Sequence, residues 1–362
     1  MEAKRIENLK VKIKEAGLGG VLVCPSKEMI YLAGFSPMMC ERFQGLFVPA
    51  EGESFYICNL LYQSEVEENI KGLKVYTWRD GEEMTDVVKE HLNKSGMSGK
   101  KIGVNSTAQA FNVLEMMDKL NETFVNAKGV FEEARIIKTR EEIDDLRKAA
   151  EIADAAFDAV VKFIKPGMAE REIADFLTNT MSSLGGAIGF CIVASGPNGS
   201  YPHYTGKDRI IQNKDLIVLD FGCVYKNMNS DMTRTVFVGG YTDEQKKVYD
   251  IVLKSNLAGE AAAVDGAYIP DVDKAARDVI DNEGYGEYFT TRLGHGIGYM
   301  GHEAPDIKKN NYRKLEKGMA FSIEPGIYLT GNFGVRIEDI VVIGLDGKTE
   351  ILNKAAKNLI VI

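Results

Sequence analysis

The sequence Leu216-Ile217-Val218-Leu219-Asp220-Phe221-Gly222 is an apolar run that leads directly into an acidic residue. Its length and its branched side chains predict a buried strand. Burying an ionised carboxylate without a partner costs a large amount of free energy. We therefore expect Asp220 to be paired, protonated or bound to a metal ion.

The same pattern recurs further along the chain. The apolar run 319–323 leads into Glu324, and Glu338 precedes another apolar run. The arginines nearest to these acids in the sequence are Arg234 and Arg336. Two guanidinium groups cannot balance four carboxylates, so divalent metal is the simplest source of the missing positive charge. The four carboxylates are those of Asp220, Asp231, Glu324 and Glu338.

One histidine has a context that suits the same site. His295 lies in Gly294-His295-Gly296-Ile297-Gly298, where glycines allow backbone and ligand to approach closely. Four carboxylates and one imidazole suit manganese, cobalt or iron better than a structural zinc site with thiolates. Two divalent ions would balance the carboxylates and leave room for a hydroxide. Each residue alone also fits an ordinary role, such as Asp231 capping Thr233 or His295 in a core, and only their joint occurrence favours metal.

The first third of the chain alternates helical and strand patterns. It predicts helices over 3–16, 82–93 and 108–120, strands over 20–24 and 101–104, and a hairpin over 47–57 turned at 51–53. Alternation on this scale indicates a small α/β domain. A helix with an apolar stripe from Ile143 to Ile164 follows, and Pro166-Gly167 ends it. We place the domain boundary between 130 and 140, which gives domains 1–133 and 134–362.

The rest of the chain is richer in strands. Apolar runs predict strands over 216–221, 234–238, 320–328, 335–343 and 350–353, with a hairpin turn at Asp346-Gly347. Two long helices are expected between them. One begins at Thr242 with Gln245 completing a capping box, and the other follows Pro270. Helices grouped against a mostly antiparallel sheet predict an α+β domain.

Composition excludes several classes of protein. The chain has 362 residues, with 44 Lys and Arg against 53 Asp and Glu, and a formal charge of −9. That balance argues against a basic surface for nucleic acid or an anionic membrane. No apolar stretch approaches the roughly 20 residues that span a bilayer, and the first residues lack a secretory pattern. The five cysteines form no CxxC pair, so we expect no disulfide, no thiolate chemistry and a cytoplasmic location.

Taken together, these motifs resemble a known family. The motifs are 220–222 with 231–234, 294–298, 323–326 and 334–339. They look like the five-ligand pattern of the pita-bread metallopeptidases. The leading part, through 27–35 and 78–82, is similar to the creatinase-type N-terminal domain of the Xaa-Pro aminopeptidase and prolidase branch. The resemblance covers essentially the whole chain and implies a creatinase-like α/β domain followed by a pita-bread catalytic domain, whose mostly antiparallel curved sheet is covered by helices.

The resemblance also implies roles for individual residues. Asp220 would chelate one metal, and His295 and Glu324 would hold the other. Asp231 and Glu338 would bridge both metals, and Arg336 would orient these bridging carboxylates. His203 matches a substrate-side histidine, and His302 matches one that steadies the tetrahedral intermediate. The ordinary alternatives are a loop residue for His203 and a solvated neighbour of Glu303 for His302, and His91 is left to the surface.

The implied activity is hydrolysis of Xaa-Pro bonds at peptide N-termini or in dipeptides, by a hydroxide bridging two divalent metal ions. Glu324 would serve as base and then acid. Manganese is expected, with cobalt, iron or zinc as alternatives. The expected partners are small peptides with proline at the second position and a second copy of the chain in a homodimer, without nucleic acid or membrane.

Two departures from the family pattern affect substrate contacts. Many relatives have a histidine where this chain has Thr291, and an aromatic residue near Met228 is absent. The rival functions are a creatinase-like hydrolase of a small molecule and a pita-bread binding module without metal. Creatinases generally lack the full ligand set, and a binding module predicts eroded ligands and charged tails. Methionine aminopeptidases normally lack such an N-terminal domain.

Overall fold

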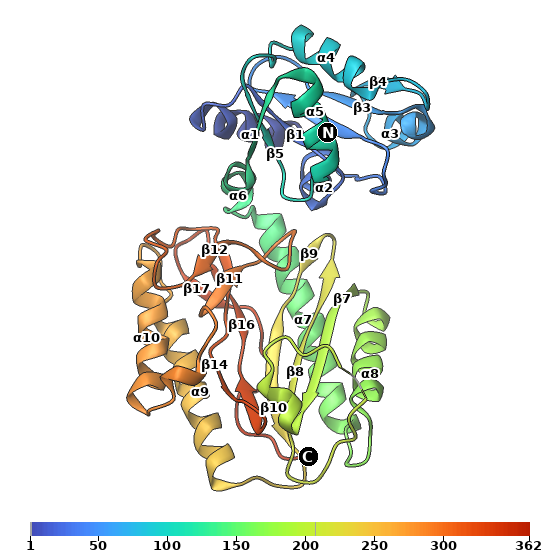
Figure 1. The fold of residues 1–362 in the computed structure, drawn as a ribbon. Helices are drawn as coiled ribbons and strands as arrows, with labels where there is room; N and C mark the ends of the chain where they lie inside the picture. The colour runs from blue at the N-terminus through green and yellow to red at the C-terminus, as the bar shows by residue number, and fades with distance from the viewer. Residues whose placement is uncertain (1, 207) are drawn as a thin grey trace. The chain divides into compact units, whose positions relative to one another are not determined.

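The computed structural model describes residues 2–206 and 208–362, which form two compact units (Figure 1). The first unit ends at Arg135 and the second is Ile136–Ile362. No helix in the described ranges is both long enough and apolar enough to cross a membrane.

The first unit is built on a six-stranded sheet in the order β4-β3-β2-β1-β5-β6. Its strands are β1 Gly20–Val23, β2 Gly45–Pro49, β3 Phe55–Asn59, β4 Lys74–Trp78, β5 Lys101–Val104 and β6 Thr123–Asn126. Its helices are α1 Ala3–Glu15, α2 Lys27–Ala33, α3 Gln63–Asn69, α4 Met84–Lys94, α5 Ala110–Leu120 and α6 Lys128–Arg135. The sheet mixes parallel and antiparallel pairs, so the predicted α/β domain is confirmed.

Burial explains why the predicted elements of this unit form. The helix α1 buries Ile6, Leu9 and Ile13, which lie one turn apart on a single face. The hairpin predicted over 47–57 is confirmed as the antiparallel pair β2 and β3. His91 corrects a prediction, because its ring stacks on Tyr76 with centroids 3.5 Å apart and is buried instead of lying at the surface.

The second unit begins with two helices that pack under an antiparallel sheet. The helices are α7 Arg140–Phe163 and α8 Glu170–Ser183, and the strands are β7 Ala187–Ser195, β8 Leu216–Tyr225, β9 Met228–Asn229 and β10 Met232–Phe237. Thr139 and Glu142 form a capping box at the start of α7. Side chains of α7 and α8 share one apolar cluster with Leu219 and Phe221 of β8. Because side chains alternate along a strand, Asp220 lies on the opposite face.

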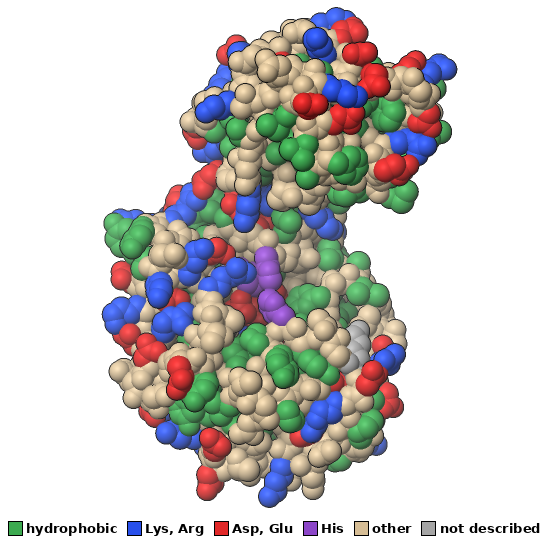
Figure 2. All heavy atoms as spheres, in the orientation of Figure 1, with side chains coloured by type: hydrophobic (Ala, Val, Ile, Leu, Met, Phe, Trp, Pro, Cys, Tyr) green, Lys and Arg blue, Asp and Glu red, His purple; other side chains and the backbone are tan. Residues whose placement is uncertain are grey.

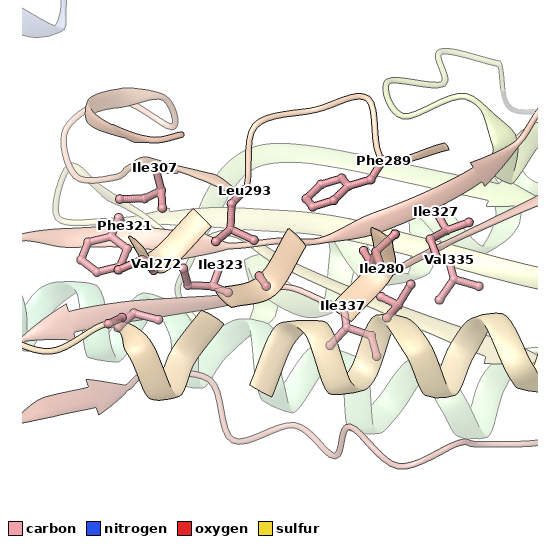
Figure 3. Packing of buried hydrophobic residues seen from close by; sticks show 14 of the residues in the cluster. Val272, Ile280, Phe289, Leu293, Ile307, Phe321, Ile323, Ile327, Val335 and Ile337 are labelled. Atoms are coloured by element: carbon pink, nitrogen blue, oxygen red, sulfur yellow. The ribbon is translucent and has the colours of Figure 1, made fainter. Parts of the chain in front are cut away.

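A second antiparallel sheet packs against the helices α9 Asp243–Ala262 and α10 Ile269–Asn282. Its strand order is β12-β11-β13-β16-β17, beside a two-stranded sheet of β14 and β15. These strands are β11 Gly294–Gly296, β12 Glu303–Ile307, β13 Ala320–Ile323, β14 Gly326–Leu329, β15 Phe333–Arg336, β16 Asp339–Ile343 and β17 Thr349–Ile351. Figure 3 shows Leu293, Ile307, Phe321 and Ile323 in the cluster that faces these helices. The capping box of Thr242 and Gln245 is confirmed.

Two predicted strands are each broken in the middle, and the breaks bring the sheets together. The strand predicted over 320–328 divides into β13 and β14 at Glu324-Pro325, because proline has no N–H to continue a ladder. The strand predicted over 335–343 divides because Glu338 leaves its own sheet and donates its backbone N–H to the Thr233 carbonyl at 3.1 Å. Glu324 and Glu338 therefore stand at strand ends where the two sheets meet.

Candidate metal centre

The carboxylates of Asp220, Asp231 and Glu338 come together where the two sheets meet. Asp220 lies on β8 opposite Thr233 of β10, and Asp231 immediately precedes β10. Oxygen atoms of all three side chains lie within 4.8 Å of one another. All three residues are buried, with 6%, 4% and 2% of their surfaces exposed. The bridge between Thr233 and Glu338 joins the two halves of this cluster.

His295 and Glu324 approach the cluster from the second sheet. His295 Nε2 lies 3.2 Å from Glu324 Oε1 and 3.7 Å from Asp231 Oδ2. His295 and Glu324 also form, together with Glu338, a group whose potential ligand atoms lie within 4.8 Å. The described residues therefore bring all five predicted ligands to one place.

Glycines on both sides of His295 permit this close approach. A Cβ atom on Gly294 would lie 1.8 Å from the Ser322 carbonyl oxygen, and one on Gly296 would lie 2.1 Å from the Ala304 carbonyl oxygen. Neither position can hold a side chain without moving the neighbouring backbone. The pairing of β11 with β12 shifts register between these two glycines. This bulge turns His295 toward the carboxylates although Leu293 points into the core on the other face.

The tautomer of His295 fits a metal ligand. Its Nδ1 lies 3.1 Å from the Gly296 carbonyl oxygen, so an Nδ1–H donates to that oxygen. Burial lowers the pKa of His295 to about 3, with further lowering by His302, so the ring is neutral at neutral pH. The lone pair of Nε2 then faces the oxygen of Glu324. A cation between His295 Nε2 and Glu324 Oε1 would remove the repulsion between their lone pairs. A metal-bound histidine commonly donates its other ring N–H, as Nδ1–H does here.

The charge of the cluster also fits bound metal. Burial, with repulsion from neighbouring carboxylates, raises the pKa of Asp231 and of Glu338 well above their usual values, and burial raises that of Glu324 to about 7. Glu338 Oε2 accepts a hydrogen bond from Thr233 Oγ1 at 2.7 Å, whereas its buried Oε1 has no partner among the described residues. Buried oxygens of this kind are the ligands that hard divalent cations bind.

Only one of the two arginines considered from the sequence faces the cluster. Arg336 contacts Asp220 through Nη2 and lies 4.0 Å from Glu338 through Nε, which also donates to Thr233 Oγ1 at 2.9 Å. Arg234 points away and forms an ion pair with Asp339 at 2.6 Å. One guanidinium therefore faces four carboxylates, so the deficit of positive charge is larger than the sequence indicated.

The other two predicted histidines line the open side of the cluster. The ring centroids of His302 and His295 are 4.0 Å apart, and those of His302 and His203 are 6.5 Å apart. Both His203 and His302 are exposed. Figure 2 shows histidine side chains at the surface of the second unit, next to acidic and basic ones. One nitrogen of His302 also lies within 4.8 Å of ligand atoms of Asp231 and His295.

Two of the ordinary roles considered for single residues do not fit this structure. The Thr233 hydroxyl donates a hydrogen bond to Glu338 at 2.7 Å. The proposed capping of Thr233 by Asp231 is not found among the described residues. Glu324 follows the end of β13, but only 17% of its side chain is exposed, so it is not an ordinary surface residue. Thr291 and Met228, the two departures, are half-buried and buried, respectively.

Several residues that support the site were not found from the sequence. Ser322 Oγ accepts a hydrogen bond from the His295 backbone N–H at 3.1 Å and contacts Glu324 at 3.2 Å. The Tyr328 hydroxyl accepts one from Arg336 at 2.8 Å. Ser322 could have been placed on the face of Glu324 by strand alternation from the core residues on either side of it. Tyr328 carried no signal in the sequence.

A buried cluster of four carboxylates and one imidazole, on two sheets covered by helices, defines a metal-dependent hydrolase of the pita-bread class. The chain belongs to metallopeptidase family M24, whose model matches residues 144–344. The model of the creatinase/prolidase N-terminal domain matches residues 5–137. The predicted fold, a creatinase-like domain followed by a pita-bread domain, is thereby confirmed.

Relatives match the chain over its whole length. A probable dipeptidase PepE of Mycobacterium tuberculosis is 34% identical, covering 99% of this chain and 96% of its own. The Xaa-Pro dipeptidase of Pyrococcus furiosus is 33% identical, covering 99% of both chains. The crystal structure of a dipeptidase from Pyrococcus horikoshii OT3 superposes with a TM-score of 0.93 at 36% identity, covering 99% of this chain and 100% of its own.

Proposed function

We propose that this protein hydrolyses the bond between an N-terminal residue and a following proline in small peptides. The observation that carries the proposal is the buried cluster of four carboxylates and one imidazole, with an unpartnered oxygen on Glu338. Membership of a metallopeptidase family and the names of the relatives support the reaction type and the proline specificity.

Five residues would hold two divalent ions in this proposal. Asp220 would bind one ion and His295 and Glu324 the other, with Asp231 and Glu338 shared between them. When bound, such a pair of ions lowers the pKa of water and polarises the carbonyl under attack. Arg336 would keep Asp220 and Glu338 in position through its contacts with Asp220 and Thr233.

Glu324 would take a proton from the attacking water and return it to the proline nitrogen. Its pKa is raised by burial to about 7 without metal, and Ser322 holds one of its oxygens at 3.2 Å. A tertiary amide nitrogen is a poor leaving group unless it is protonated, so this transfer matters for the rate. His302 would donate to the developing oxyanion, and His203 would contact the substrate on the exposed side.

Several finer points belong to the same proposal. Manganese is our choice for the native metal because an oxygen-rich set with one imidazole suits it, with cobalt, iron or zinc as alternatives. The domain limits 1–133 and 134–362, the homodimer and the cytoplasmic location stay predictions.

The test starts from metal-free protein that is reloaded separately with manganese, cobalt, iron or zinc. Each sample receives Xaa-Pro dipeptides, Xaa-Pro-Xaa tripeptides and creatine. We expect at least one metal to restore cleavage of a proline peptide and none to restore turnover of creatine. Turnover of creatine alone would support the creatinase-like alternative, and no bound metal with no cleavage would support a binding module.

Variants connect this result with the proposed ligands. Asp231→Ala and Glu338→Ala should abolish cleavage and lower the metal content, since each removes a proposed ligand. Glu283→Ala, at an exposed acid outside the cluster, should change neither. Full activity of either ligand variant in excess metal would overturn the proposed centre.

A further inference from the structure

The turn that joins β11 to β12 carries His302 at its end. Gly296 of β11 pairs with Glu303 of β12, so residues 297–302 connect the two strands. His302 is exposed and the adjacent Glu303 is buried, so their side chains face the solvent and the interior, respectively. The residue next to the proposed oxyanion donor is therefore an interior carboxylate.

Glu303 forms a buried ion pair with Lys138. Lys138 Nζ donates to Glu303 Oε1 at 2.6 Å, and the two side chains are only 2% and 1% exposed. The other carboxylate oxygen, Glu303 Oε2, accepts a hydrogen bond from the Met300 backbone N–H at 3.2 Å. Glu303 therefore binds both a lysine far away in the sequence and the backbone of its own turn.

Gly298 leaves the space that this ion pair occupies. A Cβ atom on Gly298 would lie 2.7 Å from Glu303 Oε1 and 2.8 Å from Lys138 Cε. The Gly298 carbonyl accepts two hydrogen bonds from Asn229, one from the backbone N–H at 2.9 Å and one from Nδ2 at 2.8 Å. Asn229 belongs to β9, which pairs with β8, the strand of Asp220. The turn is thereby also attached to the sheet that carries Asp220.

Lys138 is itself held beside the strand that leads to Glu324. Its backbone N–H donates to the Gly318 carbonyl at 2.8 Å. Gly318 has a φ of +87°, which favours glycine, and a Cβ atom there would lie 3.0 Å from the Lys138 carbonyl oxygen. The strand β13 begins two residues later at Ala320. Lys138 therefore links β13 to the turn that carries His302.

We propose that the turn 297–302 supports His302 and that Lys138, through Glu303, and Asn229 are its positioning residues. This inference rests on the proposed function, in which His302 donates to the developing oxyanion. Such a donor acts only when it lies about 2.7 to 3.1 Å from that oxygen, and a displacement of about 1 Å can lower a rate about 100-fold. Leaving either charge of a buried ion pair unpaired costs much free energy, so the pair resists displacement of the turn.

The test removes the ion pair without leaving a buried charge. Lys138→Met alone leaves the Glu303 carboxylate uncompensated and should lower the melting temperature. In Lys138→Met/Glu303→Gln the glutamine still accepts a hydrogen bond from the Met300 N–H, so we expect a melting temperature nearer to that of wild type. We expect kcat for Ala-Pro to stay about 10- to 100-fold below wild type in this double variant, with KM and metal content unchanged.

A second comparison separates positioning from a general structural effect. The same double substitution is made in the His302→Gln protein. If Lys138 acts through His302, it should lower kcat by less than about 2-fold in that background, because the group that it positions is already gone. Arg147→Met, which breaks an ion pair with Glu350 at 2.9 Å in the same unit, is the control and should leave kcat unchanged.

Asn229→Ala keeps the test decisive if neither Lys138 variant folds. It removes one hydrogen bond to the Gly298 carbonyl and should lower kcat roughly 2- to 10-fold, but only in protein that retains His302. Full kcat in the folded variants, equal losses with and without His302, or loss of bound metal would each overturn the role of the turn. Failure of metal-loaded wild type to cleave any Xaa-Pro peptide would instead overturn the proposed function.

Discussion

Glu338 has a buried carboxylate oxygen without a partner among the described residues and lies close to three other acids, so we expect it to affect how the stability of the metal-free protein depends on pH. Burial raises the pKa of Glu324 to about 7 and raises that of Glu338 well above its usual value. An acid with a raised pKa binds its proton more tightly in the folded state than in the unfolded chain. Such an acid therefore makes its full contribution to the free energy of unfolding below its pKa in the unfolded chain, which is about 4. This contribution is lost as the pH rises toward the pKa of the acid in the folded state.

We expect metal-free protein to become less stable between about pH 4 and pH 7, by about 1.4 kcal/mol for each unit of pKa shift. Urea unfolding at a series of pH values in the presence of a chelator measures this loss. Saturating metal should suppress the loss, because cations replace the protons. Glu338→Gln should also flatten the dependence without metal. If the free energy of unfolding of the metal-free protein instead rose steadily from about pH 4 to pH 7, the expectation would be contradicted.

His302 stands close to the ligands and also at the open side of the site. Its ring centroid lies 4.0 Å from that of His295. If His302 stabilises the oxyanion, His302→Gln should lower kcat by about 100-fold or more and leave the metal content unchanged. Elemental analysis beside steady-state kinetics separates the two roles. Loss of one metal equivalent from the variant would identify His302 as a ligand instead.

At the scale of elements, α9 and the C-terminal segment fix the strand ends that carry two of the proposed ligands. Asn256 of α9 donates from Nδ2 to the carbonyls of Ile323 at 3.0 Å and Ile337 at 3.3 Å, the residues just before Glu324 and Glu338. Lys357 Nζ donates to Asn256 Oδ1 at 2.9 Å. One buried amide thereby sets the distance between the two strand ends.

Lys357→Met should weaken metal binding although Lys357 touches no proposed ligand. Lys357 also pairs with Asp339 at 2.6 Å, the residue that follows Glu338, so its loss leaves a buried negative charge less compensated. We expect about a 10-fold loss in metal affinity, as for other residues that orient ligands. Titration calorimetry with manganese measures it. Lys354→Met, at an exposed lysine of the same segment, should bind metal like wild type, and equal affinities for all three proteins would contradict the expectation.

The elements differ in how far they follow from the sequence. Strand β8 and the helices α7 and α9 were predictable because apolar periodicity and, at Thr242, a capping box mark them locally. The break at Glu338 was missed because it depends on pairing with Thr233 of a distant strand, whereas the break at Pro325 follows from proline itself, a local signal that the strand prediction did not use. Among the five proposed ligands, Asp220, Glu324 and Glu338 were predicted from charge beside apolar runs and His295 from its flanking glycines, whereas Asn256 carries no local pattern. Its role exists only once α9 packs on the strand ends.

At the scale of the whole molecule, the chain has two units with separate cores. We therefore expect bound metal to stabilise only one of them. The core of the first unit includes Leu22, Phe47 and Ile102, and all the proposed ligands lie in Ile136–Ile362. A ligand at 100 times its dissociation constant adds about 2.7 kcal/mol to the state that binds it. For a unit of this size that corresponds to an increase of about 5 to 10 °C in melting temperature.

Differential scanning calorimetry of the full-length chain, with a chelator and then with saturating manganese, tests this expectation. We expect one of two transitions to move up by about 5 to 10 °C while the other stays in place. Glu338→Gln is the control, since it should show both transitions and no shift with metal. A single transition that moves as a whole would contradict this expectation, because it would show that the two units unfold together.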